Sequence, residues 1–170
     1  IGGSGVYNIE ALTDIEEMMR GRAEQKGLEF YVEHPAGMPR YIISDEKKLR
    51  QILINVLGNA VKFTKQGHVT LRLLELHEAA KSANGETHQL CFEISDTGVG
   101  IAAEELDNIF DAFVQTSSGQ QSHQGTGLGM PISQQFVRMM GGNLRVSSEM
   151  GKGCVFTFDI PVGIVEAADV

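Results

Sequence analysis

An apolar stripe along the segment that follows Asp45 predicts a long amphipathic helix. Its members recur every three or four residues, which is the spacing of one helix face: Leu49, Ile52, Leu53, Val56, Leu57, Ala60 and Phe63. Ser44 or Asp45 is suited to cap the first turn through a side-chain oxygen. Such a helix needs an apolar surface against which its stripe is buried.

Strand-like segments after this helix supply that surface. Apolar and polar residues alternate over Val69–Leu73 and Leu90–Ile94, and the polar stretch 80–87 between them predicts a hairpin loop. Further strands are expected at 6–9, 28–32, 144–146 and 155–160, and further helices at 12–23, around Glu104, around Phe110 and after Gly129. The sequence therefore predicts an α+β fold: a two-layer sandwich in which helices cover one face of a mixed, mainly antiparallel sheet.

The length and the ends of the chain predict one domain. A chain of 170 residues fits a single hydrophobic core. The glycine-rich residues 1–5 are expected to be a linker or an expression remnant, and the small, acidic residues 163–170 a C-terminal tail. The folded domain is then expected to span residues 6–162.

The composition argues against several classes of function. A formal net charge of −8 is unsuited to a nucleic-acid surface, and Cys91 and Cys154 lack the spacing of a zinc site or a disulfide framework. No apolar run reaches the roughly 20 residues that cross a bilayer, and no secretory leader is visible. We expect the fragment not to be inserted in a membrane and to be cytoplasmic, while its parent protein is free to carry an anchor.

A second, polar stripe lies on the helix that follows Asp45. Asn55, Asn59 and Lys62 are spaced four and then three residues apart, so they share a face. Amide oxygens are hard ligands suited to Mg²⁺, and an ammonium group offsets phosphate charge. A magnesium-phosphate site and an ordinary solvated helix face are both compatible with this pattern.

Two glycine-rich segments have a similar double interpretation. Asp96 ends a strand and precedes Gly98 and Gly100, which is compatible either with a plain turn or with close approach of a flat ligand such as adenine. The segment Gly125-Thr126-Gly127-Leu128-Gly129 opens a helix and lacks both the dinucleotide and the P-loop spacing. It is either a flexible loop or an anion-binding helix start.

Together these segments resemble the sequence boxes of sensor histidine kinases, in the order of that family, from about Val6 to Pro161. The matching segments are Asn55-x-x-x-Asn59-Ala60-x-Lys62-Phe63-Thr64, Asp96-x-Gly98-x-Gly100-Ile101, Ile109-Phe110-Asp111-Ala112-Phe113, Gly125-Thr126-Gly127-Leu128-Gly129 and Gly151-x-Gly153. The resemblance implies the Bergerat ATP-binding fold, with ATP and Mg²⁺ as cofactors.

The resemblance also implies roles for these residues. Asp96 would read the adenine amino group, Asn59 would hold Mg²⁺ with help from Asn55, and Lys62 would contact phosphate. A lid over residues 115–124, expected to be mobile, would cover the phosphates. The remaining implied nucleotide contacts are Phe63, Gly98, Gly100, Ile101, Phe113, Gly125, Thr126, Gly127, Leu128, Gly129 and Cys154.

One position separates the classes of this superfamily. ATPase relatives carry a glutamate that activates water at the position of Asn55, and an amide cannot serve as that base. The resemblance therefore implies a protein histidine kinase whose acceptor histidine lies on separate dimerisation helices and whose phosphate passes to a response-regulator receiver domain. A serine-directed kinase of the anti-sigma type and a degenerate binding module are the alternatives. Gln121, Gln124 and Cys154 depart from the usual family residues.

Overall fold

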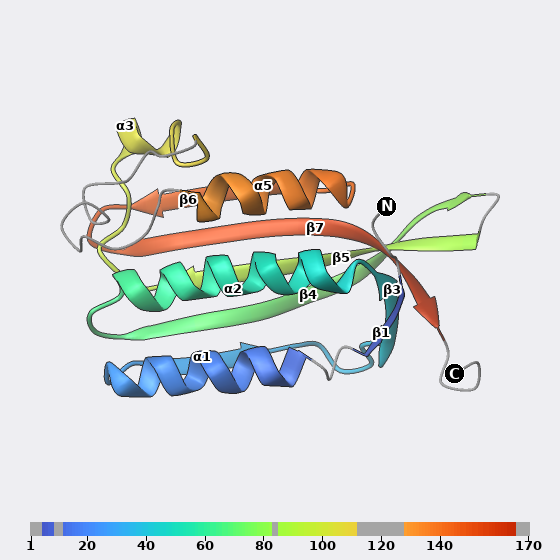
Figure 1. Ribbon diagram of the computed structural model, residues 1–170, viewed down its shortest axis with the longest axis horizontal. Helices are drawn as coiled ribbons and strands as arrows, with labels where there is room; N and C mark the ends of the chain where they lie inside the picture. The colour runs from blue at the N-terminus through green and yellow to red at the C-terminus, as the bar shows by residue number, and fades with distance from the viewer. Residues whose placement is uncertain (1–4, 9–11, 83–84, 112–127, 166–170) are drawn as a thin grey trace.

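The computed structural model describes residues 5–8, 12–82, 85–111 and 128–165 (Figure 1). Along the chain its elements are β1 (Gly5–Asn8), α1 (Thr13–Gln25), β2 (Glu29–Glu33), β3 (Tyr41–Ser44), α2 (Glu46–Phe63), β4 (His68–Ser82), β5 (Gly85–Asp96), α3 (Ala103–Leu106), α5 (Gly129–Met139), β6 (Asn143–Glu149) and β7 (Gly153–Val165). None of the described helices is long and apolar enough to span a bilayer.

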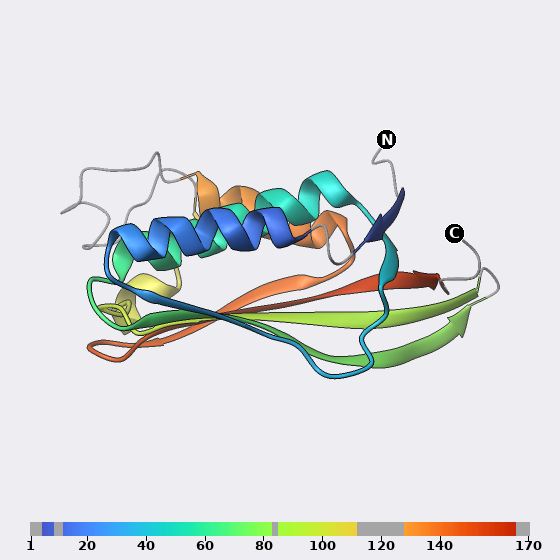
Figure 2. The ribbon, with the colours of Figure 1, turned by 90° about the horizontal axis from the view of Figure 1, so that it is seen from below.

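The strands form one seven-stranded sheet, and the helices form a layer on one of its faces. The strand order is β1-β3-β7-β5-β4-β2, with β6 pairing to β7. The β2–β4 pair is parallel, and the other pairs are antiparallel. Turned by 90°, the molecule shows α1, α2 and α5 on the same side of the long strands (Figure 2). The predicted two-layer α+β sandwich is confirmed.

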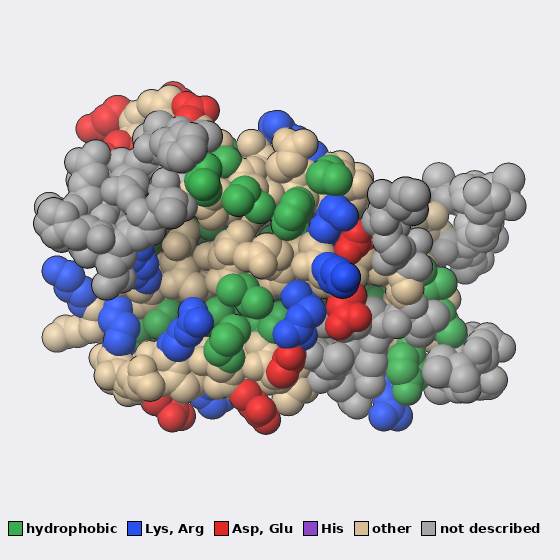
Figure 3. All heavy atoms as spheres, viewed as in Figure 1, with side chains coloured by type: hydrophobic (Ala, Val, Ile, Leu, Met, Phe, Trp, Pro, Cys, Tyr) green, Lys and Arg blue, Asp and Glu red, His purple; other side chains and the backbone are tan. Residues whose placement is uncertain are grey.

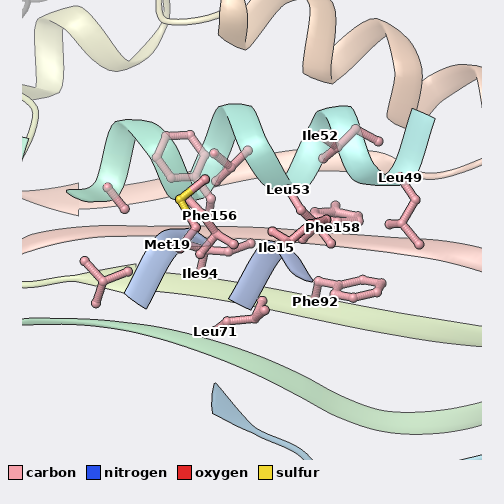
Figure 4. Close-up of a cluster of buried hydrophobic side chains, with 14 of the residues drawn as sticks. Ile15, Met19, Leu49, Ile52, Leu53, Leu71, Phe92, Ile94, Phe156 and Phe158 are labelled. Carbon is pink, nitrogen blue, oxygen red and sulfur yellow. The ribbon is translucent and has the colours of Figure 1, made fainter. Parts of the chain in front are cut away.

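The apolar stripe of α2 is buried between the sheet and α1. Leu49 and Leu53 are fully buried, together with Phe92 on β5 and Phe158 on β7 (Figure 4). The two phenylalanines are direct cross-strand partners, and their rings stack with centroids 4.8 Å apart. Burying such side chains is the main favourable term in folding. The packing fixes α2 over the centre of the sheet, and with it the polar stripe that α2 carries.

Asp45 is the residue that caps α2. It has an extended backbone, and its side-chain Oδ1 accepts a hydrogen bond of 3.2 Å from the Lys48 amide. Its Oδ2 lies 2.8 Å from Lys48 Nζ. Of the two predicted caps Asp45 is therefore the one used, and Ser44 ends β3.

Removing this cap should lower the stability of the domain modestly. Asp45→Ala is expected to reduce the free energy of unfolding by about 1 kcal/mol, measured by urea denaturation. The Lys48 contact holds the pKa of Asp45 below its ordinary value. The contribution is therefore present above the unfolded pKa of about 4 and lost as pH falls through the lower folded pKa. A loss equal to that of the exposed control Lys47→Ala would contradict the capping role.

The hairpin between β4 and β5 extends further than predicted. Strand pairing continues to Ser82 and Gly85, so most of the predicted loop 80–87 is strand. Two register shifts interrupt the ladder on the way, between Leu74 and His77 and between Glu78 and Lys81. The end of this hairpin projects beyond the helix layer (Figure 2). Because no helix covers it there, backbone pairing continues without the apolar alternation that the prediction relied on.

Two other boundaries differ from the predictions. Of the helix expected around Phe110, the described residues 107–111 form turns: the amide of Asn108 donates to the Glu105 carbonyl and that of Asp111 to the Asn108 carbonyl. Asp107 and Asn108 are poor helix formers, which accounts for the short α3. At the C-terminus, β7 continues past residue 162, and Gly163–Val165 pair with β3. The sheet thus includes the first part of the predicted tail.

Candidate nucleotide-binding site

Asp96 lies at the end of β5 with its carboxylate held in one orientation. Its Oδ1 accepts hydrogen bonds from the amide of Gly98 at 2.9 Å and from the amide of Cys154 at 3.3 Å. Burial raises the pKa of this carboxyl, and the two amide contacts oppose that rise. Among the described residues, none donates to Oδ2. One oxygen of a partly desolvated carboxylate is thus without a donor among the described residues.

The loop after Asp96 packs so closely on its neighbours that it requires glycine. A Cβ on Gly98 would come within 2.8 Å of the Phe63 carbonyl oxygen at the end of α2. Gly100 has a φ of +78°, and a Cβ there would overlap the Glu149 carbonyl. Both glycines of the first glycine segment are therefore explained by close backbone approach, which brings the loop against α2 on one side and the β6–β7 turn on the other.

Ser148 on β6 joins this loop to β7, and it was not among the predicted site residues. The amide of Ile101 donates to Ser148 Oγ at 2.7 Å, and that hydroxyl donates to the Gly153 carbonyl at 2.9 Å. The signal that pointed to it is the strand period: Leu144, Val146 and Ser148 occupy the inward positions of β6. A hydroxyl in place of the next apolar residue indicates a polar partner inside the fold.

Cys154 contributes its backbone to this cluster. Its amide holds Asp96, and its thiol lies 3.2 Å from Ser148 Oγ. Burial raises the pKa of the thiol to about 11, with a further rise from the Asp96 charge. At neutral pH the thiol is protonated and uncharged. Cys154, a predicted nucleotide contact, thus places an uncharged side chain beside the Asp96 carboxylate.

The C-terminal half of α2 carries the predicted phosphate-binding residues. Asn59 is half-buried, and its side chain makes no hydrogen bond with another described residue. Lys62 Nζ lies 5.0 Å from the centroid of the Phe63 ring, and burial lowers the pKa of Lys62. The last carbonyls of the helix are satisfied elsewhere, because Lys26 Nζ donates to Val61 and Lys62. The Asn59 amide and the Lys62 ammonium form no hydrogen bond or ion pair with another described side chain.

Asn55 makes a contact between two helices. Its Nδ2 donates to the Gly129 carbonyl at 3.3 Å and to Ser133 Oγ at 3.1 Å, both on α5. Its Oδ1 accepts from Gln51 Nε2 at 2.9 Å. Ser133 and Gln51 were not predicted as site residues. Of the two predicted amide ligands, Asn55 is already hydrogen-bonded and Asn59 has no described partner.

The second glycine segment is described only at its end. Leu128 is the residue before α5, and its carbonyl accepts from the Ile132 amide at 3.0 Å. Gly129 is the first residue of the helix and lies against Asn55. The other predicted contacts, at Phe113, Gly125, Thr126 and Gly127, and the predicted lid 115–124 lie outside the described residues.

Basic and acidic side chains are mixed on the helical face. Of the basic residues of α2, Lys48 pairs with Asp45 at 2.8 Å and Arg50 with Asp14 at 2.6 Å, whereas Lys62 forms no ion pair with a described residue. In the view of Figure 3, Lys and Arg side chains lie across the middle of this face, and acidic side chains lie at its upper edge over α3, along its lower edge and beside some of the basic ones. The described part of the chain contains no cluster of His, Cys, Asp or Glu that suits a metal ion. The amide oxygen of Asn59 is a hard ligand of the kind that Mg²⁺ accepts beside phosphate and water.

The structure brings the predicted residues into two groups along α2. Asp96, Gly98, Gly100, Ile101 and Cys154 meet at the C-terminal end of the helix, beside Phe63. Asn55 and Gly129 meet at its middle, roughly 12 Å away by the helical rise, with Asn59 and Lys62 on the turns between. This arrangement places a carboxylate at one end of a site and a glycine-rich helix start at the other.

Comparison with known proteins agrees with this arrangement. The family described as histidine kinase-, DNA gyrase B-, and HSP90-like ATPase matches residues 44–164. The aerobic respiration control sensor protein ArcB of Escherichia coli strain K12 is 42% identical over 151 residues, which are 88% of this chain and 18% of ArcB. The autoinducer 2 sensor kinase/phosphatase LuxQ of Vibrio cholerae is 37% identical over 161 residues, or 94% of this chain and 18% of LuxQ. The chain thus spans about a fifth of the length of these relatives.

Solved structures show the same fold. Full-length ShkA in complex with AMPPNP superposes with a TM-score of 0.76 at 34% identity, covering 97% of this chain and 33% of that one. The catalytic domain of histidine kinase ThkA superposes with a TM-score of 0.72 at 22% identity, covering 94% and 95%. The chain belongs to the histidine kinase-, DNA gyrase B-, and HSP90-like ATPase family, as an ATP-binding catalytic domain of the sensor histidine kinase type.

Proposed function

We propose that this chain binds Mg-ATP and donates the γ-phosphoryl group to a histidine on the dimerisation helices of its parent kinase. Asp96 supports the adenine end of this proposal, because one carboxylate oxygen is held by two amides and the other has no described donor. The exocyclic amine of adenine is a donor of the required kind. The AMPPNP bound to ShkA supports an adenine nucleotide as the ligand.

Asn59 and Lys62 fit a magnesium-phosphate group. The Asn59 amide is a hard neutral ligand without a described partner, and Mg²⁺ takes one or two protein ligands beside substrate phosphates and water. Bound there, the ion would offset charge on the phosphates. Lys62 would contact phosphate, as would the segment from Gly125 to Gly129, with Phe63 packing near the nucleotide.

The amide at position 55 favours transfer of the γ-phosphoryl group to a protein over hydrolysis of ATP. Asn55 stands where a glutamate would activate water, and its amide is bound to Gln51, Gly129 and Ser133 instead. An amide does not accept a proton from water. The nucleophile is then supplied by the incoming imidazole, and this chain contributes positioning and electrostatic stabilisation.

The proposal also specifies partners and boundaries. Dimerisation helices would supply the acceptor histidine, and a response-regulator receiver domain would take the phosphate in turn. We place the catalytic domain at residues 5–165, from the start of β1 to the end of β7, and in the cytoplasm, where ATP is available. A serine-directed relative would differ in its product, because phosphoserine is acid-stable and phosphohistidine is acid-labile.

The chain alone is expected to give no acid-labile phosphohistidine with labelled ATP. His77, the histidine that most resembles an acceptor by its following Glu78, lies on β4 opposite Gln89 and not on a helix. Adding the dimerisation helices of the parent kinase should produce the label, and helices whose acceptor histidine is replaced by glutamine should not. Acid-labile label on His77 would contradict the proposal, and acid-stable label on the helices would favour the serine-directed alternative.

A further inference from the structure

Ser133 is a fully buried hydroxyl on the inner face of α5. It has 0% exposure and shares that face with Met130 and Val137. A buried hydroxyl destabilises the fold unless it is hydrogen-bonded. Ser133 Oγ donates to the Gly129 carbonyl at 2.8 Å and accepts from Asn55 Nδ2 at 3.1 Å. The hydroxyl is thus placed to accept from α2 while it donates within the first turn of α5.

The Gly129 carbonyl, which can only accept, fixes the NH₂ group of Asn55 toward α5. Gln51 complements this orientation, because its Nε2 donates to Asn55 Oδ1 at 2.9 Å on the other side of the amide. The inverted amide would oppose its oxygen to the Gly129 carbonyl and its NH₂ group to that of Gln51. Gln51, Asn55 and Ser133 therefore form a directed chain of donors and acceptors across the two helices.

This chain ends at the residue that joins the second glycine segment to α5. Gly129 is both the last glycine of that segment and the first residue of the helix. Asn55 lies one turn before Asn59 on α2. Its side-chain amide therefore connects Gly129 to the part of α2 that carries Asn59 and Lys62, the predicted metal and phosphate ligands. The adenine-reading cluster at Asp96 contains none of these three residues.

We propose that Gln51 and Ser133 are positioning residues for the phosphate half of the nucleotide site. They hold the Asn55 amide in one orientation, and that amide holds the start of α5 at a fixed place relative to Asn59 and Lys62. This inference rests on the proposed ATP binding. It makes Asn55 a clamp between helices in the structure described, in addition to any contact with the nucleotide.

If Ser133 and Gln51 position the phosphate half of the site, their replacement should lower the affinity for phosphate-bearing nucleotides and leave that for adenosine nearly unchanged. Ser133→Ala removes one of the two acceptors of Asn55 Nδ2 and the donor to the Gly129 carbonyl, without introducing a poor helix former. It is expected to weaken ATP and ADP binding about tenfold, which corresponds to the net contribution of about one hydrogen bond, while adenosine affinity changes less than about twofold. Gln51→Glu, at the exposed end of the three-residue chain, is also expected to weaken ATP and ADP binding, because its carboxylate would face the Asn55 Oδ1 oxygen and repel it. Gln135→Ala, an exposed position on α5, is the control.

Calorimetry with ATP, ADP and adenosine tests this, together with the Asn55 side-chain NH₂ resonances in nitrogen-15 NMR spectra. The inference requires a phosphate-dependent loss in both variants and a shift of the Asn55 resonances in Ser133→Ala. Equal losses for ATP and adenosine, or affinities equal to those of Gln135→Ala, would overturn it. If the wild type bound no ATP, the proposed function would fail, and unchanged Asn55 resonances in Ser133→Ala would still overturn the clamp separately.

Discussion

Asn59→Ala is expected to abolish magnesium-dependent ATP binding and to leave the domain folded. Asn59 is half-buried on the polar stripe of α2, away from the buried face that carries Leu53 and Leu57. Alanine is the better helix former, so α2 should persist. Loss of residues that only support metal ligands typically costs 10- to 100-fold, so the loss of a direct ligand should exceed about 100-fold in Mg-ATP affinity.

The measurement is a calorimetric titration of Mg-ATP into Asn59→Ala and into Asn143→Ala, an exposed asparagine on β6. Circular dichroism of both variants checks that the fold is kept. Repeating the titration without magnesium separates the metal from the nucleotide, because the wild type and Asn59→Ala should then differ little. Unchanged Mg-ATP affinity in Asn59→Ala would rule out the assignment of the metal ligand.

Asp96→Asn is expected to weaken ATP binding about 100-fold, because it sets a donor against a donor. The amides of Gly98 and Cys154 both donate to Oδ1, so the oxygen of an asparagine should take that place. Its NH₂ group then occupies the position of Oδ2 and faces the adenine amine. Binding of inorganic triphosphate, which lacks the base, should stay within about twofold of the wild type.

The preference of the wild type for ATP over GTP tests the same role of Asp96 without a mutation. GTP carries a carbonyl where ATP carries the amine, so it presents an acceptor to a carboxylate and should bind far more weakly. Asp107→Asn, an exposed aspartate after α3, is the matched control for the charge change and should keep wild-type affinity. Equal affinities of the wild type for ATP and GTP would contradict the adenine-reading role of Asp96.

The fold was predictable where a long apolar pattern marks a buried face, but β3 (Tyr41–Ser44) was not predicted, because four residues carry too short a pattern even though Ile42 is buried. The stripe of α2 follows from the need to bury one helix face, and Leu90, Phe92 and Ile94 on β5 follow from the same need on the sheet. The outer part of the β4–β5 hairpin was missed because it extends past the helices, where backbone pairing needs no apolar pattern. β7 was expected to end earlier because Pro161 and Gly163 interrupt the strand signal, although pairing with β3 carries it on to Val165.

The site was predictable where a motif is local in sequence. Asp96, Gly98 and Gly100 form one turn, and their close approaches explain why glycine is required. Ser148 and Ser133 were missed because each acts on a distant segment: Ser148 on Ile101, 47 residues away, and Ser133 on Asn55, 78 residues away. Single hydroxyls carry no local signal of such tertiary partners, beyond their presence on an otherwise apolar face.

A titration of the wild-type chain with ATP, with and without magnesium, tests whether the chain is a magnesium-dependent kinase domain. We expect saturable binding of ATP at one site per chain, strengthened by Mg²⁺, with GTP far weaker. We also expect no release of inorganic phosphate above background, because Asn55 cannot activate water. Absence of ATP binding, or steady hydrolysis of bound ATP by the chain alone, would contradict that assignment.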